Sequence, residues 1–178
     1  MFNYNKLTKT LIIQSEIDYE LVNLPNAEIM IFENTEPNYS KFNQNVNNLP
    51  LNLTHLIFGF NFNQNVNKLP PNLTHLTFGD NFNQNVDKLP INLTHLTFGN
   101  NFNQNVDNLT FIKCWSFTSK SFIKNNIPVF ITKINIIFYK NDIRIEYITN
   151  LPPTIQEIKI NMKDKIHYLK KNFLWLYC

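Results

Sequence analysis

The stretch that decides the fold is LPPNLTHLTFGDNFNQNVDK, at residues 69–88. It follows LPLNLTHLIFGFNFNQNVNK at 49–68 and precedes LPINLTHLTFGNNFNQNVDN at 89–108, and the twenty-residue frame never slips. A catalytic segment has no chemical reason to recur at a fixed spacing, whereas a coil of backbone does. A period of twenty lies in the range of leucine-rich-type repeats, in which each coil adds one short strand to a parallel sheet.

The segment LTHLTFG alternates as a half-buried strand does. Leu76 and Phe78 should point into the core, and His75 and Thr77 should point outward. Equivalent phenylalanines of successive coils should stack in register and supply much of the core. One predicted column is Phe62, Phe82 and Phe102, extended by Phe42, and the other is Phe58, Phe78 and Phe98.

Two other repeat positions predict local constraints. The three glycines of the chain, Gly59, Gly79 and Gly99, share one position, which indicates either a positive φ or no room for a Cβ atom. Asparagine recurs at two candidate positions for a ladder of side-chain amides that satisfies backbone groups. The first position comprises Asn61, Asn81 and Asn101, and its rival comprises Asn63, Asn83 and Asn103. The retention of Asn43 one coil earlier favours the rival, and the choice stays open.

Degenerate copies extend the pattern in both directions. TLII at 10–13 and LPNAEIMIF at 24–32 precede the regular coils, and WSF within 112–117, IPVFITKINI at 127–136 and LPPTIQEIKI at 151–160 follow them. The spacing of apolar residues over 163–178 then changes to that of a helix. We therefore predict one β-rich solenoid with a parallel sheet on one face. Its parts are an N-terminal cap and degenerate coil at 1–41, regular repeats at 42–108, degenerate coils at 109–162 and a capping α-helix at 163–178.

Composition narrows the function classes. The formal charge is only +3, and residues 42–107 hold two lysines and three aspartates, so there is no basic stripe for nucleic acid. No apolar run reaches membrane-spanning length. Two cysteines without a C-x-x-C pair and a start without a signal-peptide pattern favour a reducing, cytoplasmic setting, in the host cell if the chain is viral. No catalytic motif is found, so we predict a protein that is not an enzyme and uses no cofactor.

The best candidate site is a column of outward histidines, His55, His75 and His95, spaced about 4.8 Å apart on neighbouring strands. Together with Ile57, Thr77 and Thr97 they form the sheet face that solenoids typically use to bind a partner. Three alternatives are open for the histidines: a metal site, a pH-sensing surface, or plain repeat surface. For the whole chain, the main hypothesis is a scaffold that binds protein, and the rival is a divergent paralogue with little activity.

The array LPxNLTHLxFGxxFNQ resembles the FNIP repeat family of social amoebae and giant amoeba viruses, strongly over 42–108 and weakly over 24–160. The resemblance implies leucine-rich-repeat-like coils, and by analogy with F-box members a link to ubiquitin-ligase machinery, although residues 1–41 carry no F-box pattern. The chain departs from the family in two ways. It lacks the glycine that often precedes LP, and it has asparagine where the family has proline after FNQ, at Asn45, Asn65, Asn85 and Asn105.

Overall fold

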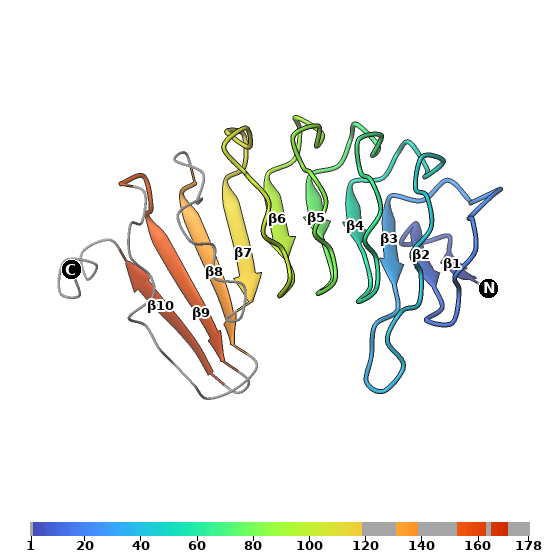
Figure 1. Cartoon of the computed structure of the whole chain (residues 1–178), viewed down its shortest axis with the longest axis horizontal. Coiled ribbons are helices and arrows are strands. Elements are labelled where there is room, and N and C mark those ends of the chain that lie inside the picture. The colour runs from blue at the N-terminus through green and yellow to red at the C-terminus, as the bar shows by residue number, and fades with distance from the viewer. Residues whose placement is uncertain (1, 119–130, 139–152, 163–164, 171–178) are drawn as a thin grey trace.

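The computed structural model describes residues 2–118, 131–138, 153–162 and 165–170. Within these ranges the chain forms a single sheet of ten strands whose order in space is their order in sequence (Figure 1). The strands are β1 (Phe2–Asn5), β2 (Thr10–Ile13), β3 (Ile29–Phe32), β4 (His55–Ile57), β5 (His75–Thr77), β6 (His95–Phe98), β7 (Cys114–Thr118), β8 (Lys133–Phe138), β9 (Glu157–Met162) and β10 (Lys165–Lys170).

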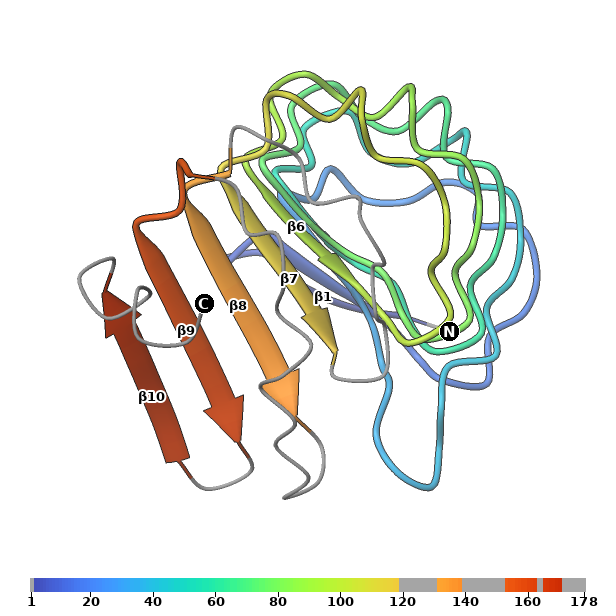
Figure 2. The same ribbon diagram turned by 60° about the vertical axis from the view of Figure 1, so that its left-hand side comes forward.

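The sheet is parallel in its interior and antiparallel at both edges. Each neighbouring pair from β2 to β9 is parallel, whereas β1 pairs with β2 and β10 pairs with β9 in antiparallel fashion. In the regular coils the chain returns from one strand to the next on the far side of the core (Figure 2). The predicted β-solenoid with a parallel sheet is therefore confirmed.

The register follows the period of the sequence. His55 pairs with His75 and His75 pairs with His95, so that equivalent residues lie side by side across β4, β5 and β6. Since each coil contains twenty residues and each strand uses the same three of them, every repeated side chain acquires a copy of itself as its nearest neighbour in the next coil. This geometry converts a sequence repeat into columns of like side chains.

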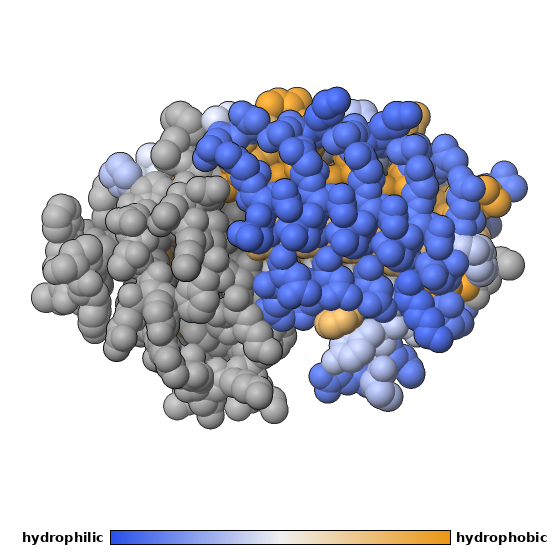
Figure 3. Space-filling model, in the orientation of Figure 1, coloured by the Kyte–Doolittle hydropathy of each residue, from blue (hydrophilic) through white to orange (hydrophobic). Residues whose placement is uncertain are grey.

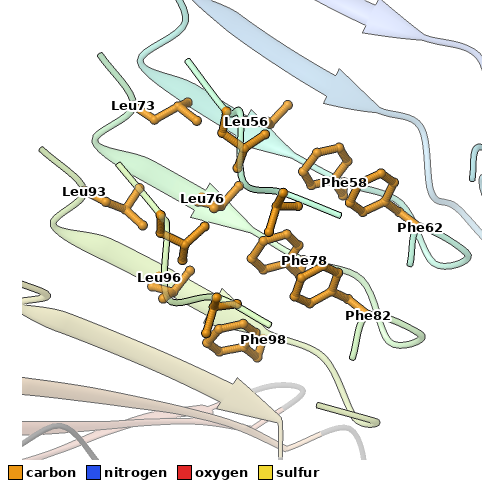
Figure 4. Packing of buried hydrophobic residues seen from close by; sticks show 14 of the residues in the cluster. Leu56, Phe58, Phe62, Leu73, Leu76, Phe78, Phe82, Leu93, Leu96 and Phe98 are labelled. Atoms are coloured by element: carbon orange, nitrogen blue, oxygen red, sulfur yellow. The ribbon is translucent and has the colours of Figure 1, made fainter. Parts of the chain in front are cut away.

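The core is built from two interlocked phenylalanine columns (Figure 4). Within one coil, the rings of Phe78 and Phe82 stack with centroids 3.7 Å apart. Between coils, Phe62 and Phe82 are 6.1 Å apart and Phe58 and Phe78 are 5.6 Å apart. These rings are at most 2% exposed, and burying a phenylalanine side chain contributes about 1.5–3 kcal/mol. The predicted columns are confirmed.

Leucines fill the other end of each coil, beside the start of the strand. Leu73 and Leu76 are fully or almost fully buried, as are their counterparts in the neighbouring regular coils. Val66 and Val86 close the return side of the core, where the FNQNV segment turns. The valine and phenylalanine of FNQNV therefore both face the core, and the amides between them lie at the boundary with solvent.

The recurrent glycines are required by close contact between coils. None of the glycines has a positive φ. A Cβ atom on Gly79 would lie 2.1 Å from the carbonyl oxygen of Gly59, and one on Gly99 would lie 2.4 Å from that of Gly79. Of the two explanations that the sequence left open, the lack of room for a Cβ atom is correct.

The degenerate strands lie where the weak repeats predict them. TLII forms β2, and β3, β7, β8 and β9 fall in or beside the other degenerate copies. The sequence pattern did not predict β1, which forms a hairpin with β2 and pairs with it from Phe2–Ile13 to Asn5–Thr10.

The predicted C-terminal helix over 163–178 is wrong. Residues Lys165–Lys170 form β10, which pairs with β9 from Lys165–Met162 to Lys170–Glu157. Residues 163–164 and 171–178 lie outside the described part of the chain. Without β10, the outer edge of β9 would expose a row of unpaired backbone donors and acceptors. Pairing with β10 satisfies the groups on that edge of β9. The pairing with β9 therefore decides the conformation of this segment, because the helical spacing of Ile166 and Leu169 is only a weak signal.

The glycine contact predicts a strong effect of a single methyl group. Gly79→Ala should lower the free energy of unfolding by about 2 kcal/mol or more, because neighbouring backbone occupies the position of the new atom. The control Ile91→Ala, at a side chain that is 71% exposed, should change it by less than about 0.5 kcal/mol. Urea unfolding measures both variants. Equal stability of the two variants would contradict the close packing of coils.

Candidate functional site

The histidine column lies on the outer face of the sheet. The inward neighbours of these residues, such as Leu76, are buried, while His55 and His75 are half-buried and His95 is exposed. The imidazole rings stack face to face, with centroids 4.2 Å apart between His55 and His75 and 4.1 Å apart between His75 and His95. The in-register strands alone bring the three rings together.

Each histidine is held by the threonine that precedes it. The hydroxyl of Thr74 lies 2.9 Å from Nδ1 of His75 and donates to the carbonyl oxygen of Thr54 in the previous coil at 3.1 Å. The same pair of contacts recurs for Thr54 with His55 and for Thr94 with His95. With the hydroxyl proton on the carbonyl, the arrangement favours the tautomer in which Nδ1 carries the ring proton and donates to the hydroxyl oxygen. The Nε2 lone pair is then left as the free acceptor of each neutral ring.

His75 and His95 resist protonation. Burial lowers the pKa of His75 first, and repulsion from His95 and His55 lowers it further. Burial also lowers the pKa of His95, followed by the influence of His55 and of Lys133. Stacked imidazolium rings would repel each other in the same way as any like charges at this distance. Near neutral pH, His75 and His95 are therefore mainly uncharged.

The metal-binding alternative for this column is not supported. Among the described residues there is no group of three or more histidine, cysteine or acidic side chains that could hold a metal ion. The near-parallel rings explain this result. Their interplanar angles are 11° and 10°, so their nitrogen lone pairs run side by side instead of converging on the tetrahedral centre that zinc requires.

The second outward row contains the other predicted face residues. Ile57, Thr77 and Thr97 are paired across β4, β5 and β6. Towards the N-terminus this row continues through Ile31 and Ile12, so the face becomes apolar there. The structure therefore places all six predicted face residues on one continuous surface.

Sequence reasoning missed how the histidine row ends. His95 pairs with Cys114, and Cys114 pairs with Lys133. The steps from His95 to Cys114 and from Cys114 to Lys133 are nineteen residues, so extrapolation of the twenty-residue frame misses both positions. The alternation of the degenerate strands is the signal that could have found them. Lys133 is followed in the row by Glu157, and their side chains form an ion pair at 3.7 Å.

The first asparagine position forms a ladder of side-chain amides. Nδ2 of Asn81 donates to Oδ1 of Asn61 at 3.0 Å, and Nδ2 of Asn101 donates to Oδ1 of Asn81 at 3.1 Å. Nδ2 of Asn61 donates to the carbonyl oxygen of Ser40, which begins the ladder. Asn61 and Asn81 are therefore each a donor to the previous coil and an acceptor from the next.

The rival position also forms a ladder, of a different kind. Oδ1 of Asn63 accepts from the backbone N–H of Asn83 at 2.9 Å and from Nε2 of Gln84 at 3.0 Å. The same pair of bonds links Asn43 to the next coil, and Asn83 to the coil after that. At the start, the carboxylate of Asp18 takes the place of the amide oxygen and accepts from Asn43 and Gln44. The rival position therefore satisfies a backbone group in each of these coils, whereas the first position mainly links side-chain amides to each other.

The asparagines that replace the family's proline have their own structural role. Oδ1 of Asn45, Asn65 and Asn85 accepts from the backbone N–H two residues later, at 2.7–2.9 Å. Such an Asx turn bends the chain by a side-chain hydrogen bond, where proline would restrict φ. Figure 3 shows the resulting surface of the regular coils as parallel ridges of hydrophilic side chains.

Stacked coils, one short parallel strand per coil and side-chain ladders define a leucine-rich-repeat-like β-solenoid. Residues 65–88 match the FNIP repeat family, which confirms the resemblance seen in the sequence. The crystal structure of CroV588, described as a novel circular LRR protein and coming from a giant virus, superposes with a TM-score of 0.63 and 32% sequence identity. The alignment covers 85% of this chain and 23% of CroV588.

No curated protein matches the sequence. In the described part of the chain, no helix has the length and apolar character needed to cross a membrane.

The two ladders predict opposite tolerance to aspartate. In Asn81→Asp, the donor to Asn61 becomes a carboxylate oxygen that faces another oxygen, and the free energy of unfolding should fall by about 1–3 kcal/mol. Asn83→Asp keeps the acceptor for Asn103 and Gln104, as Asp18 does naturally, and should change stability by less than about 0.5 kcal/mol. Urea unfolding at neutral pH measures both. Equal losses would contradict the assigned donors and acceptors.

The lowered pKa of His75 predicts a pH-dependent stability. Above its ordinary pKa of 6.5 the residue is neutral in both the folded and the unfolded chain, and no stability is lost. As the pH falls below that value, the unfolded chain binds the proton more readily, so the folded state is destabilised. Between about pH 7.5 and about pH 5.5, His75→Asn should therefore lose less stability than the unchanged protein in urea unfolding. An equal loss would exclude this role of the column.

Proposed function

We propose that the chain is a non-enzymatic repeat scaffold that binds a protein partner through the outer face of its sheet. The proposed contact surface consists of His55, Ile57, His75, Thr77, His95 and Thr97. The FNIP repeat match and the similarity to an LRR protein support a scaffold. We further propose that the strands belong to one solenoid domain with the divisions predicted from the sequence, except for the C-terminal helix, and that the protein acts in the cytoplasm.

The observation that carries this proposal is the contrast between the two sides of a coil. On the return side, the amides of residues such as Asn63 and Asn81 are already engaged by neighbouring coils. On the sheet side, the Nε2 atoms of the histidine column and the side chains of Ile57 and Thr77 are turned to solvent or half-exposed. The outward histidines therefore retain hydrogen-bonding capacity at Nε2, whereas the ladder amides of the return side are engaged by neighbouring coils.

The rigidity of the face also supports binding. Each imidazole is fixed by a threonine contact and by stacking on its neighbour. A ligand that docks here would order few side chains, which lowers the entropic cost of association. The analogy with ubiquitin-ligase adaptors names one class of partner, and it rests on the family resemblance alone.

Disruption of the face should abolish capture of a partner. In a pull-down from an amoebal lysate, the double variant His75→Glu and Thr77→Arg should lose at least about tenfold of the captured partner, because both side chains lie at the centre of the face. The control Asn67→Arg changes an exposed residue of the return side and should keep full capture. Unchanged capture by the double variant would exclude this surface.

A further inference from the structure

In each ring of the histidine column the threonine contact engages Nδ1 and leaves Nε2, and all three rings lie on the outer face of the sheet. Nδ1 of each ring is engaged by its threonine. That contact persists when the ring is protonated, because Nδ1 donates in both states. The only atom that changes role is Nε2, which becomes an N–H donor on the outer face. On a protonated column, the Nε2–H groups therefore donate to water or to an anion from outside the chain.

Within the described residues, the carboxylates nearest the column are already in ion pairs with lysines. Strands β4 to β8 contain no aspartate or glutamate. On the N-terminal side, Glu28 is paired with Lys9. On the C-terminal side, His95 is followed in its row by Cys114 and Lys133, and Glu157 beyond them is paired with Lys133.

The groups on the C-terminal side of His95 add positive charge or none. Lys113 precedes β7 and is exposed, and Lys159 lies two residues after Glu157 in β9, three strands away from β6. Burial raises the pKa of the Cys114 thiol, which keeps it uncharged near neutral pH. The face is therefore neutral to weakly basic when the histidines are uncharged, and strongly basic when they take up protons.

We propose that this face binds an extended acidic peptide segment laid across strands β4 to β6, and that binding is coupled to proton uptake by His55, His75 and His95. Each carboxylate accepts a charge-assisted hydrogen bond from Nε2–H, and such bonds are stronger than those between neutral groups. The ligand charge also offsets the repulsion between stacked rings. The proposal rests on the proposed function and specifies the chemistry of its partner.

The test uses a fluorescently labelled heptapeptide that alternates glutamate and glycine, with fluorescence anisotropy as the readout. Its carboxylates are ionised at both pH values used, since glutamate has a pKa of about 4.3. The unchanged protein should bind this probe at least about tenfold more tightly at about pH 5.5 than at about pH 7.5, because proton uptake is linked to binding. The same peptide with glutamine in place of glutamate should not bind.

The variants separate the column from the general charge of the protein. Replacement of His55, His75 and His95 by asparagine should remove the tightening at low pH. The control variant is His167→Asn, because His167, the fourth histidine of the chain, lies in β10 outside the column. This variant should bind the probe more tightly at low pH, as the unchanged protein does. If the triple variant retains the pH dependence, or if the glutamine peptide binds as well as the acidic one, the proposal is overturned.

A second measurement keeps the proposal testable if the triple variant does not fold. Proton NMR of the imidazole C–H groups gives the pKa of each histidine with and without the acidic probe. The probe should raise the pKa of His75 and His95 and leave that of His167 unchanged, and equal values with and without probe would exclude the proposal. The two proposals can fail separately. If the acidic probe does not bind but the face variant still loses the captured partner, this inference is wrong and the proposed function stands.

Discussion

Successive coils of this protein lie in direct contact with no offset along the sheet, and every other feature depends on that register. It is enforced at Gly79 and Gly99, where the backbone of the previous coil occupies the space that a Cβ atom would need, and at Gly59, where the side chain of Ser40 occupies it. It is stabilised by stacked rings such as Phe62 and Phe82. Under this constraint each repeated residue must be compatible with a copy of itself about 4.8 Å away.

This self-compatibility explains the unusual composition of the repeats. A charged side chain repeated at strand spacing would face its own charge, whereas an asparagine side chain can donate to one neighbour and accept from the other. The pairs Asn61–Asn81 and Asn81–Asn101 show this behaviour. Where the ladder at Asn43 begins, no earlier coil needs a donor, and the pure acceptor Asp18 replaces the amide. The low charge within 42–107 agrees with this rule, and the charges that do recur, Lys68 with Lys88 and Asp87 with Asp107, lie at exposed turn positions.

The same rule gives the sheet face its chemical character. Neutral imidazoles stack without repulsion, and the threonine contacts favour the tautomer in which Nδ1 carries the proton. Burial and then repulsion from His95 and His55 lower the pKa of His75, and burial, His55 and Lys133 lower that of His95. The environment of these two rings therefore favours their neutral state.

The regular coils could be predicted from the sequence because their period is constant. Once Phe62 and Phe82 are twenty residues apart on a repeated strand, their stacking follows, and so does the histidine column. Prediction failed where the repeat period changes, and where a contact between residues far apart in the sequence determines the local structure. The nineteen-residue steps to Cys114 and Lys133 hid the end of the histidine row, and the contact from Asp18 to Asn43 follows no repeat. At 165–170 the edge of β9 imposed a strand on a short segment that periodicity alone assigned to a helix.

The most direct measurement of the register compares two deletions by circular dichroism and urea unfolding. Removal of residues 69–88 takes out one whole coil and joins equivalent positions, so the account predicts a cooperatively folded protein of somewhat lower stability. Removal of residues 69–86 leaves the later coils two residues out of frame, and the account predicts loss of cooperative folding. Similar unfolding curves for the two shortened proteins would contradict the claim that in-register contact between coils holds the structure together.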